Sequence, residues 1–371
     1  MNLRIDLECY RGKKVLVTGH TGFKGSWLCE WLLALGADVY GFSNGIPTKP
    51  SLFVQLRLAK RIKRDICGDV RDRSAVYAAI KSIRPDFVFH LAAQPLVRLS
   101  YAQPVETFDT NIMGTVNVLD ALRRMQDGKS KIWHCSAVCI TTDKVYENNE
   151  KGLAFKESDA LGGYDPYSAS KGACEVAIQS YRRAFFSAPD CRVRIASARA
   201  GNVIGGGDWA IDRIVPDAMR AYLAGSPLAI RNNRSTRPWQ HVLEPLSGYL
   251  MLGAWLDVQK GSAKLRESAQ SSYAFNFGPD PKNVKTVGQL VKELSKTLRT
   301  LKTMDRTDPN AVHEARLLTL DSHKATSVLG WKPDWDFKTT VAMVARWYDA
   351  VMVAGENAAE VTQRQIAEFC A

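Results

Sequence analysis

The feature of this sequence that most constrains its fold is an apolar run at residues 14–18, which leads through a glycine-rich turn into an apolar-periodic helix ending near Leu35. Such a run has the composition of a strand buried on both faces of a parallel sheet. The turn contains Gly19, Gly22 and Gly25. In a dinucleotide-binding βα unit, the first glycine turns the chain, the second lets backbone approach a pyrophosphate and the third lets the helix pack on the sheet. The spacing predicts such a unit, with an ordinary βα turn as the alternative.

Two later segments are typical of the same sheet. A short strand-like segment precedes Asp69 and Val70, and the Asp69 carboxylate could accept a hydrogen bond from an adenine amino group. The alternative for Asp69 is a carboxylate at a helix N-terminus. Residues 87–94 are a predicted strand that ends in small residues, which let backbone lie against a cofactor.

Strand and helix patterns alternate from residue 14 to about residue 198. This alternation predicts an α/β fold with a doubly wound, Rossmann-like parallel sheet, and two long helices are expected within it, at residues 104–125 and 166–186. Turn-rich and aromatic segments follow and predict a smaller, mainly C-terminal substrate-binding lobe. We expect a dinucleotide-binding domain at residues 1–199 and the substrate lobe at residues 200–371, with the chain crossing back to the sheet.

The helix predicted at residue 166 begins with Tyr167 and carries Lys171 one turn later. Residues four apart lie on one face of a helix, so the ammonium can sit beside the phenol and make its oxygen a usable base. Exposed helices carry the same spacing by chance, and context must decide between the two interpretations. The context here is a polar segment after a predicted strand, Thr142-Asp143-Lys144, whose own alternative is a surface turn.

Together these motifs resemble the extended short-chain dehydrogenase/reductase family, with its TGxxGxxG loop, its strand ending in LAA and its YxxxK helix. The resemblance narrows to the CDP-glucose 4,6-dehydratases, a sugar-nucleotide branch, and covers the chain from about residue 10 to about residue 350. It implies a place in deoxysugar and lipopolysaccharide O-antigen biosynthesis. Four segments in order carry it, and together they are far more specific than any single motif: residues 20–28, 91–101, 201–209 and 237–245.

The resemblance implies that CDP-D-glucose is converted to CDP-4-keto-6-deoxy-D-glucose. Tyr167 takes the proton of the C4 hydroxyl while the C4 hydride moves to NAD, and the field of Lys171 and the nicotinamide is expected to lower the pKa of Tyr167. Thr142 holds the C4 oxygen by a hydrogen bond. The new ketone acidifies C5–H, so that water can leave once Asp143 protonates the C6 oxygen and Lys144 removes the C5 proton. The hydride then returns to C6.

Two roles remain open for Lys144. The dTDP-glucose members of the family place an Asp-Glu pair where this chain has Asp143 and Lys144. A lysine must be neutral to act as a base, which burial near Lys171 and a cofactor cation favours and a neighbouring carboxylate opposes. Lys144 is therefore expected either to take the C5 proton or to stabilise the enolate. The Asp-Lys pair also favours a cytidine over a thymidine nucleotide.

The resemblance assigns NAD binding to the glycine loop, to the strand ends and to the Tyr-Lys helix: Gly19, Thr21, Gly22, Phe23, Lys24, Gly25, Asp69, Val70, Leu91, Ala92, Ala93, Tyr167 and Lys171. The second predicted strand lacks the acidic residue that usually holds the adenosine ribose, and Ser43 stands near its end. Arg64 or Lys60 could instead accommodate the 2′-phosphate of NADP. NAD is favoured because the hydride is returned within one catalytic cycle.

The resemblance places the substrate against a second group of residues: Gln94, Asn202, Trp209, Arg213, Arg231, Arg237 and His241. Arginine suits a diphosphate because its planar fork donates two hydrogen bonds. Each arginine alone is more often a surface charge than a ligand, and only Arg237 is favoured as a ligand, by its Arg-Pro-Trp-Gln-His context. A nucleotide-sugar 4-epimerase, a ketoreductase and a non-enzymatic dinucleotide sensor are the alternatives. Asp143 and Lys144 argue against the epimerase, since epimerisation eliminates no water.

The positive net charge of the chain is consistent with the binding of small, anionic phosphorylated ligands. The net charge is +12, but the basic residues form no long tract, so we expect no nucleic-acid partner. No apolar run approaches the ~20 residues that cross a bilayer, and no secretory signal is recognisable. We therefore expect no membrane association and a cytoplasmic location. The eight cysteines include no CxxC pair, which predicts reduced thiols and no bound metal.

The two long predicted helices carry apolar stripes wider than one sheet face requires. In the family that the chain resembles, the equivalent helices form a four-helix interface between subunits. We therefore expect a homodimer or a dimer of dimers. The alternative is that both stripes pack wholly inside one subunit.

Overall fold

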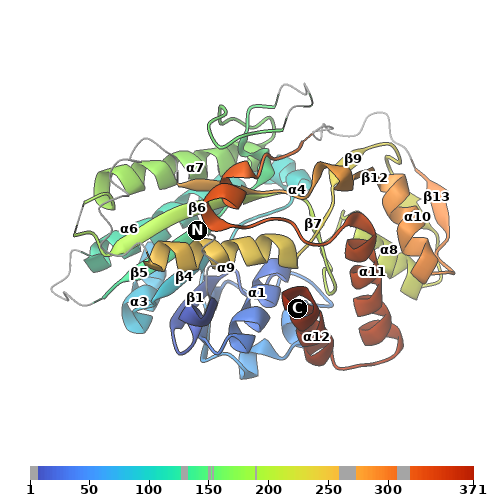
Figure 1. Ribbon diagram of the computed structural model, residues 1–371, viewed down its shortest axis with the longest axis horizontal. Coiled ribbons are helices and arrows are strands. Elements are labelled where there is room, and N and C mark those ends of the chain that lie inside the picture. Colours follow the sequence, from blue (N-terminus) through green and yellow to red (C-terminus); the bar gives the residue numbers. More distant parts are fainter. Residues whose placement is uncertain are drawn as a thin grey trace.

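The computed structural model describes residues 7–126, 133–148, 152, 154–188, 190–258, 273–306 and 318–371. Its centre is a seven-stranded sheet with the order β11-β6-β5-β4-β1-β2-β3, in which every neighbouring pair is parallel (Figure 1). The strands are β1 (Lys14–Thr18), β2 (Asp38–Ser43), β3 (Arg64–Cys67), β4 (Phe87–His90), β5 (Cys135–Ile140), β6 (Val193–Ala200) and β11 (Ala274–Phe277). The strand order reverses between β1 and β4, and the predicted doubly wound α/β fold is confirmed.

Helices cover both faces of this sheet. One face carries α1 (Phe23–Ala34) and α9 (Leu243–Val258), with α12 (Ala358–Cys370) against α1, and the other carries α3 (Arg73–Ile83), α6 (Gly114–Gln126) and α7 (Pro166–Phe185). Alternate residues of a strand point to opposite faces. On β1, Val15 and Val17 therefore join the apolar cluster of the first face, whereas Leu16 joins that of the second.

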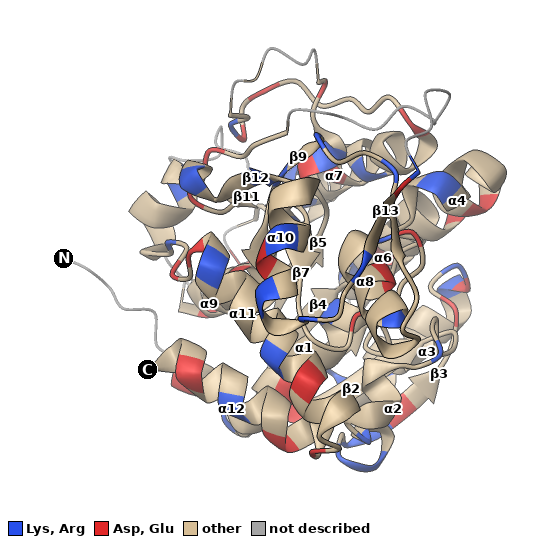
Figure 2. Cartoon of the chain, turned by 90° about the vertical axis from the view of Figure 1, so that its right-hand side faces the viewer, with Lys and Arg blue, Asp and Glu red and all other residues tan. Residues whose placement is uncertain are grey.

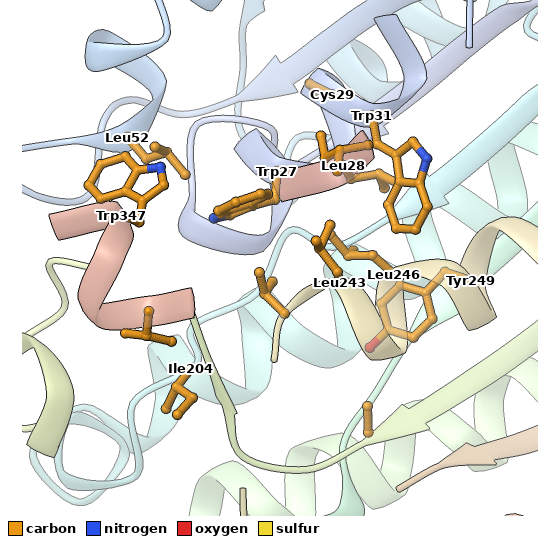
Figure 3. Close-up of a cluster of buried hydrophobic side chains, with 14 of the residues drawn as sticks. Trp27, Leu28, Cys29, Trp31, Leu52, Ile204, Leu243, Leu246, Tyr249 and Trp347 are labelled. Atoms are coloured by element: carbon orange, nitrogen blue, oxygen red, sulfur yellow. The ribbon is translucent and has the colours of Figure 1, made fainter. Parts of the chain in front are cut away.

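Helix α1 packs against α9 through large apolar side chains (Figure 3). Trp27 and Leu28 of α1 lie with Leu243 and Leu246 of α9 in one fully buried cluster. Trp27 Nε1 also donates to the backbone carbonyl of Gly206 at 2.9 Å. Burying each such side chain contributes roughly 1.5–3 kcal/mol. These contacts fix the helix that follows the glycine loop against the second half of the chain.

The helix predicted at residues 104–125 is interrupted. It consists of α5 (Pro104–Phe108), a π-helical turn η3 (Asp109–Met113) and α6. Asn111 in the π-helical turn is buried and donates from Nδ2 to Ser170 Oγ of α7 at 2.8 Å. Single π-helical turns inside α-helices are frequent at functional sites. Helix α7 forms as predicted, one residue shorter than expected.

The second half of the chain builds a smaller lobe and also returns to the sheet. The lobe, at the right of Figure 1, holds three two-stranded sheets, β10-β7, β12-β9 and β13-β8, with helices α8, α10 and α11. The chain comes back through α9 and β11, and the boundary at residue 199 stays a prediction. The lobe elements are β7 (Val203–Ile204), α8 (Ile214–Leu223), β8 (Leu228–Ile230), β9 (Thr236–Pro238), β10 (Gln240–His241), β12 (Val284–Thr286), α10 (Val287–Thr297), β13 (Thr303–Asp305) and α11 (Phe337–Tyr348).

Short helices complete the described chain: η1 (Leu7–Tyr10), α2 (Leu52–Gln55), η2 (Leu58–Lys60), α4 (Val97–Ala102), η4 (Asp143–Val145), η6 (Pro281–Asn283), η7 (Ala325–Leu329) and η8 (Asp349–Val353). Basic and acidic residues alternate along α10 and α12 (Figure 2). Within the ranges that the structure describes, no helix has the length and apolarity needed to span a membrane.

Candidate active site

The polar segment predicted to carry the chemistry lies at the carboxyl end of β5, where ligands bind in open α/β sheets. Thr142 caps the short helix η4 and donates from Oγ1 to Asp143 Oδ1 at 2.9 Å. Lys144 Nζ donates to the same oxygen at 3.1 Å. The Asp143 side chain is 1% exposed and that of Lys144 22% exposed, so the carboxylate is enclosed while the amine reaches the edge of the site.

The free oxygen of Asp143 is the most informative atom of this turn. Its Oδ2 is buried and has no hydrogen-bond partner among the described residues. Buried polar atoms are rarely left without a partner unless they serve a ligand or a reaction. Asp143 therefore offers one oxygen held by its neighbours and one oxygen available to a substrate.

Helix α7 brings Tyr167 and Lys171 to this turn. Asp165 caps the helix by accepting a hydrogen bond from Ser168 N at 2.9 Å, and the helix begins at Pro166. Tyr167 and Lys171 are both buried. Lys171 Nζ donates to the backbone carbonyl of Ile140 at 3.1 Å. Tyr167 and Lys171 therefore lie on one buried face of α7, as their spacing predicts. This face lies against the end of β5.

The pKa of Tyr167 is set mainly by burial. Burial raises it to about 12, while a hydrogen bond with Thr142 acts in the opposite direction. Desolvation of the phenolate is thus the largest effect among the protein's own groups, and the lower pKa expected from Lys171 together with a bound nicotinamide stays a prediction. Burial also lowers the pKa of Lys171. The hydrogen bond joins Thr142 to Tyr167, two residues from separate segments of the sequence.

The glycine loop has the shape needed for a dinucleotide. Gly19 has a φ of +73°, and a Cβ there would lie 2.7 Å from the backbone nitrogen of Ala92. A Cβ at Gly25 would overlap the carbonyl oxygen of Gly19. Gly22 caps α1 without a side chain, so the first N–H groups of the helix can face a phosphate. These residues fit an NAD pyrophosphate, and Thr21 steadies the loop by donating to the Gly45 carbonyl at 2.6 Å.

The strand ends beside this loop carry the other predicted cofactor residues. Val70 follows β3 and is buried, while Leu91, Ala92 and Ala93 follow β4 directly. Asp69 accepts hydrogen bonds from Arg71, which is the main cause that lowers the pKa of its carboxyl. Asp72, and not Asp69, caps helix α3. The alternative role of Asp69 as a helix cap is therefore wrong.

The side chain of Lys24 extends from the glycine loop toward α9. The sequence did not predict this contact. Lys24 Nζ donates to the Tyr249 hydroxyl at 3.3 Å, and Figure 3 shows Tyr249 on α9. Burial of the amine and repulsion from Arg213 lower the pKa of Lys24 to about 7, while attraction to Asp143 acts in the opposite direction. Tyr249 is fully buried, and burial together with the nearby charge of Asp143 raises the pKa of its hydroxyl. The pair thus lies beside the turn at residues 142–144, and Tyr249 carries no motif that could have marked it in the sequence.

The predicted substrate residues separate into three groups. Asn202 follows β6, and Arg213, at the N-cap of α8, pairs with Asp208 at 3.1 Å and influences the pKa of both Lys24 and Tyr167. Trp209 is buried nearby and donates from Nε1 to Gln55 Oε1 at 3.2 Å. Arg213 therefore borders the candidate site, whereas Trp209 packs with α2 and α11.

The second group lies farther out on the lobe. Arg231 pairs with Asp212 at 2.6 Å, and Arg237 in β9 donates to the Thr236 carbonyl at 2.9 Å. Gln94 belongs to a third group with structural contacts, since its side chain donates to Thr107 Oγ1 at 2.9 Å.

His241 also belongs with the structural residues. It is fully buried in β10, where its ring contacts the rings of Trp27 and Trp335. Burial lowers the pKa of His241 to about 3, so the ring is neutral. Its Nε2 has no hydrogen-bond partner in the part of the chain that the structure describes. The structure thus places His241 in the aromatic core behind the site.

The parallel sheet, the glycine loop and the buried Tyr-Lys helix define a Rossmann-fold enzyme of the short-chain dehydrogenase/reductase class. Residues 16–344 match the protein family described as GDP-mannose 4,6 dehydratase. The chain belongs to that family.

Individual relatives span nearly the whole chain. A CDP-glucose 4,6-dehydratase of Salmonella typhimurium is 42% identical over 368 residues, which cover 98% of this chain and 98% of the relative. A dTDP-glucose 4,6-dehydratase of Shigella flexneri is 25% identical and covers 90% of this chain and 92% of its own.

Solved structures share the fold. A dTDP-glucose 4,6-dehydratase from Bacillus anthracis in complex with NAD has a TM-score of 0.72 at 21% identity, covering 91% of this chain and 97% of its own. A UDP-glucose 4-epimerase from Thermotoga maritima with UDP-glucose has a TM-score of 0.74 at 20% identity, covering 91% and 99%. At these identities, the likeness concerns the fold alone.

Proposed function

We propose that the protein is an NAD-dependent CDP-glucose 4,6-dehydratase, a lyase that converts CDP-D-glucose to CDP-4-keto-6-deoxy-D-glucose. The observation that carries this proposal is the enclosed Asp143 beside Lys144, joined through Thr142 to the buried Tyr167. The 42% identity to a CDP-glucose 4,6-dehydratase over 98% of the chain supports the nucleotide and the sugar. An epimerase uses a similar Tyr-Lys pair, but it eliminates no water and needs no buried acid there.

The residues of the turn and of α7 divide the reaction between them. Tyr167 removes the proton of the C4 hydroxyl, and Thr142 holds that oxygen. When bound, NAD accepts the C4 hydride and returns it at C6. Asp143 gives a proton to the departing C6 oxygen through Oδ2, since Oδ1 is engaged by Thr142 and Lys144. Lys144 takes the C5 proton or stabilises the enolate that forms.

Two further sets of residues bind the dinucleotide and the nucleotide sugar. The loop at residues 19–25, Asp69 with Val70, and residues 91–93 hold the dinucleotide, and the Tyr-Lys helix meets its nicotinamide end. Asn202 and Arg213 face the nucleotide sugar, and Arg231 and Arg237 lie around the nucleotide and its diphosphate. Gln94 and Trp209 support the site through their structural contacts. His241 supports the site from the core.

Product analysis tests the proposal. The purified protein is incubated separately with CDP-, dTDP-, UDP- and GDP-hexoses, and product masses are recorded with the nicotinamide absorbance. We expect CDP-glucose to lose the mass of one water without net change in absorbance. Ready dehydration of another nucleotide sugar, with CDP-glucose unchanged, contradicts the cytidine assignment. Conversion to CDP-galactose supports the epimerase, and stoichiometric cofactor consumption supports a ketoreductase.

We also propose a homodimer formed by α5 and α7. Exposed apolar side chains gather on these neighbouring helices: Val105 is 73% exposed on α5, and Val176 is 58% exposed on α7. Phe108 and Phe185 near the helix ends are exposed as well. Apolar patches of this kind are typical of surfaces that a partner covers.

Sedimentation of the variants Val105→Asp and Val176→Asp tests the dimer. We expect a dimer for the wild type and monomers for both variants, because a carboxylate in an apolar interface is costly to desolvate. Val54→Asp on α2, at a side chain of similar exposure, is the control. A monomeric wild type contradicts the proposal.

A nucleotide-sugar substrate and eight unbridged cysteines support our proposal of a cytoplasmic location.

A further inference from the structure

Helix α7 carries a third buried polar residue on the face that holds Tyr167 and Lys171. Glu175 follows Lys171 by one turn and forms an ion pair with Arg199 of β6, with Oε2 and Nη2 2.8 Å apart. Both side chains are only 3% exposed. The proposed reaction uses neither of them, although a buried ion pair is costly to desolvate and calls for an explanation.

The Glu175–Arg199 pair forms hydrogen bonds with both ends of the turn at residues 141–146, which contains Asp143 and Lys144. Glu175 accepts from Thr141 Oγ1 at 2.5 Å, and Thr141 directly precedes Thr142. Arg199 Nη1 donates to the Tyr146 hydroxyl at 2.7 Å, and Tyr146 directly follows η4. The segment that contains Asp143 and Lys144 is thus held at each end by one member of the pair.

Further contacts fix the pair itself. Ser197 of β6 donates from Oγ to Glu175 Oε2 at 2.7 Å. The Tyr146 hydroxyl donates to Asn276 Oδ1 of β11 at 2.7 Å, and the Tyr146 ring stacks on Phe155. The network therefore links α7, β6 and β11 to the turn through buried groups, and side chains held this way keep one geometry.

We propose that Glu175 and Arg199 are positioning residues that hold the Asp143-Lys144 turn in register with Tyr167 and Lys171 on α7. The inference rests on the proposed function for its chemical consequence. A shift of the turn moves both Asp143 and Lys144, whereas Tyr167 and Lys171 stay on α7 and lose only the support from Thr142. Loosening the turn therefore impairs the elimination of water more than the oxidation at C4.

Variants that loosen the turn without leaving a buried charge unpaired are the sharpest test. Thr141→Val removes the hydrogen bond to Glu175, and Tyr146→Phe removes the hydrogen bonds to Arg199 and Asn276. Both variants retain nearly the same volume. Glu175→Gln removes the charge itself and is the stronger variant. Glu30→Gln is the matched control, because Glu30 is also fully buried and pairs with Arg61 at 2.6 Å, between α1 and η2.

Two rates are measured for each variant: the appearance of reduced nicotinamide after mixing with CDP-glucose, and the formation of dehydrated product. We expect Thr141→Val and Tyr146→Phe to form product about tenfold to a hundredfold more slowly, the scale of a small misplacement of catalytic groups. Reduced nicotinamide should appear with a much smaller loss of rate and should accumulate. Glu30→Gln should show no such separation of the two rates.

Two outcomes overturn the inference: unchanged product formation in both mild variants, or an equal loss of both rates, which indicates a general structural role. Backbone amide exchange of residues 141–146 in the cofactor-free protein provides a readout independent of the reaction. Faster exchange there in the network variants, but not in Glu30→Gln, supports the positioning role; unchanged exchange contradicts it. If the wild-type protein dehydrates no nucleotide sugar, the proposed function is wrong. The amide-exchange test of the positioning role can still be carried out, because it does not depend on the reaction.

Discussion

Lys171 donates a hydrogen bond from Nζ to the backbone carbonyl of Ile140 at 3.1 Å, which ties the buried face of α7 to the last residue of β5. The polar turn at residues 141–144 continues directly from that strand. One side chain therefore joins the two sequence segments that carry the proposed chemistry. A charged donor makes this a stronger bond than one between neutral groups.

The variant Tyr167→Phe should lower turnover by roughly a hundredfold or more, the usual scale for a positioned acid-base group. It keeps the ring and removes only the hydroxyl, so the nucleotide sugar should still bind. Steady-state kinetics and calorimetric titration check the two parts. Tyr164→Phe, at an exposed position just before the helix, is the control. Wild-type turnover in Tyr167→Phe would show that Tyr167 is not the base.

The variant Asp143→Asn should still oxidise C4 but should not release water, because the isosteric amide cannot supply the proton for the C6 oxygen. Reduced nicotinamide should therefore rise on mixing with CDP-glucose and remain. Absorbance of the bound cofactor, recorded together with product mass, checks this outcome. If Asp143→Asn dehydrates CDP-glucose normally, the acid is another group.

The variant Lys144→Met separates the two roles of this lysine. Both roles allow oxidation at C4, but only a base exchanges the C5 hydrogen with deuterated solvent. If Lys144 is the base, exchange in the trapped intermediate should fall by roughly the hundredfold typical of a lost acid-base group. Mass spectrometry of the recovered sugar measures it. Exchange at the normal rate would assign Lys144 to electrostatic support of the enolate.

The variant Lys24→Met should stabilise the cofactor-free protein more at pH 6 than at pH 10. The pKa of Lys24 is lowered to about 7 in the folded protein and is about 10.4 in an unfolded chain. Between these values the unfolded chain binds more protons, so the stability of the wild type rises with pH. The cost of the buried charge is therefore fully present below pH 7 and relieved on the alkaline side.

Thermal unfolding of both proteins across this pH range measures the effect. The difference in melting temperature between Lys24→Met and wild type should shrink as the pH rises. Lys13→Met, at an exposed lysine next to β1, should show no comparable trend. A difference for Lys24→Met that does not depend on pH would mean that the amine remains charged in the folded protein.

Local patterns predicted much of the fold and the central part of the candidate site. Residues 14–18 form β1 because Val15, Leu16 and Val17 are apolar and suit a strand buried on both faces, and Gly19 adopts the positive φ that its turn requires. Tyr167 and Lys171 share a buried face because helical spacing alone fixes their relation. Features of this kind depend on residues close together in sequence.

Features that depend on tertiary contacts could not be predicted. Lys24 finds Tyr249, a partner far away in the sequence, and the segment 109–113 widens into a π-helical turn where Asn111 meets Ser170 on another helix. The pKa of Tyr167 rises because of burial, which no motif reports. His241 lies in a motif that resembles a binding segment, yet it packs among aromatic rings in the core.

The position of β11 at the edge of the sheet has a consequence for synthesis on the ribosome. β11 pairs with β6, although a large part of the chain lies between the two strands. Until residues 274–277 have been translated and have left the ribosomal tunnel, the outer edge of β6 presents unpaired backbone groups, and such edges invite association with other chains. The nascent enzyme should therefore need a chaperone most while the lobe is being made.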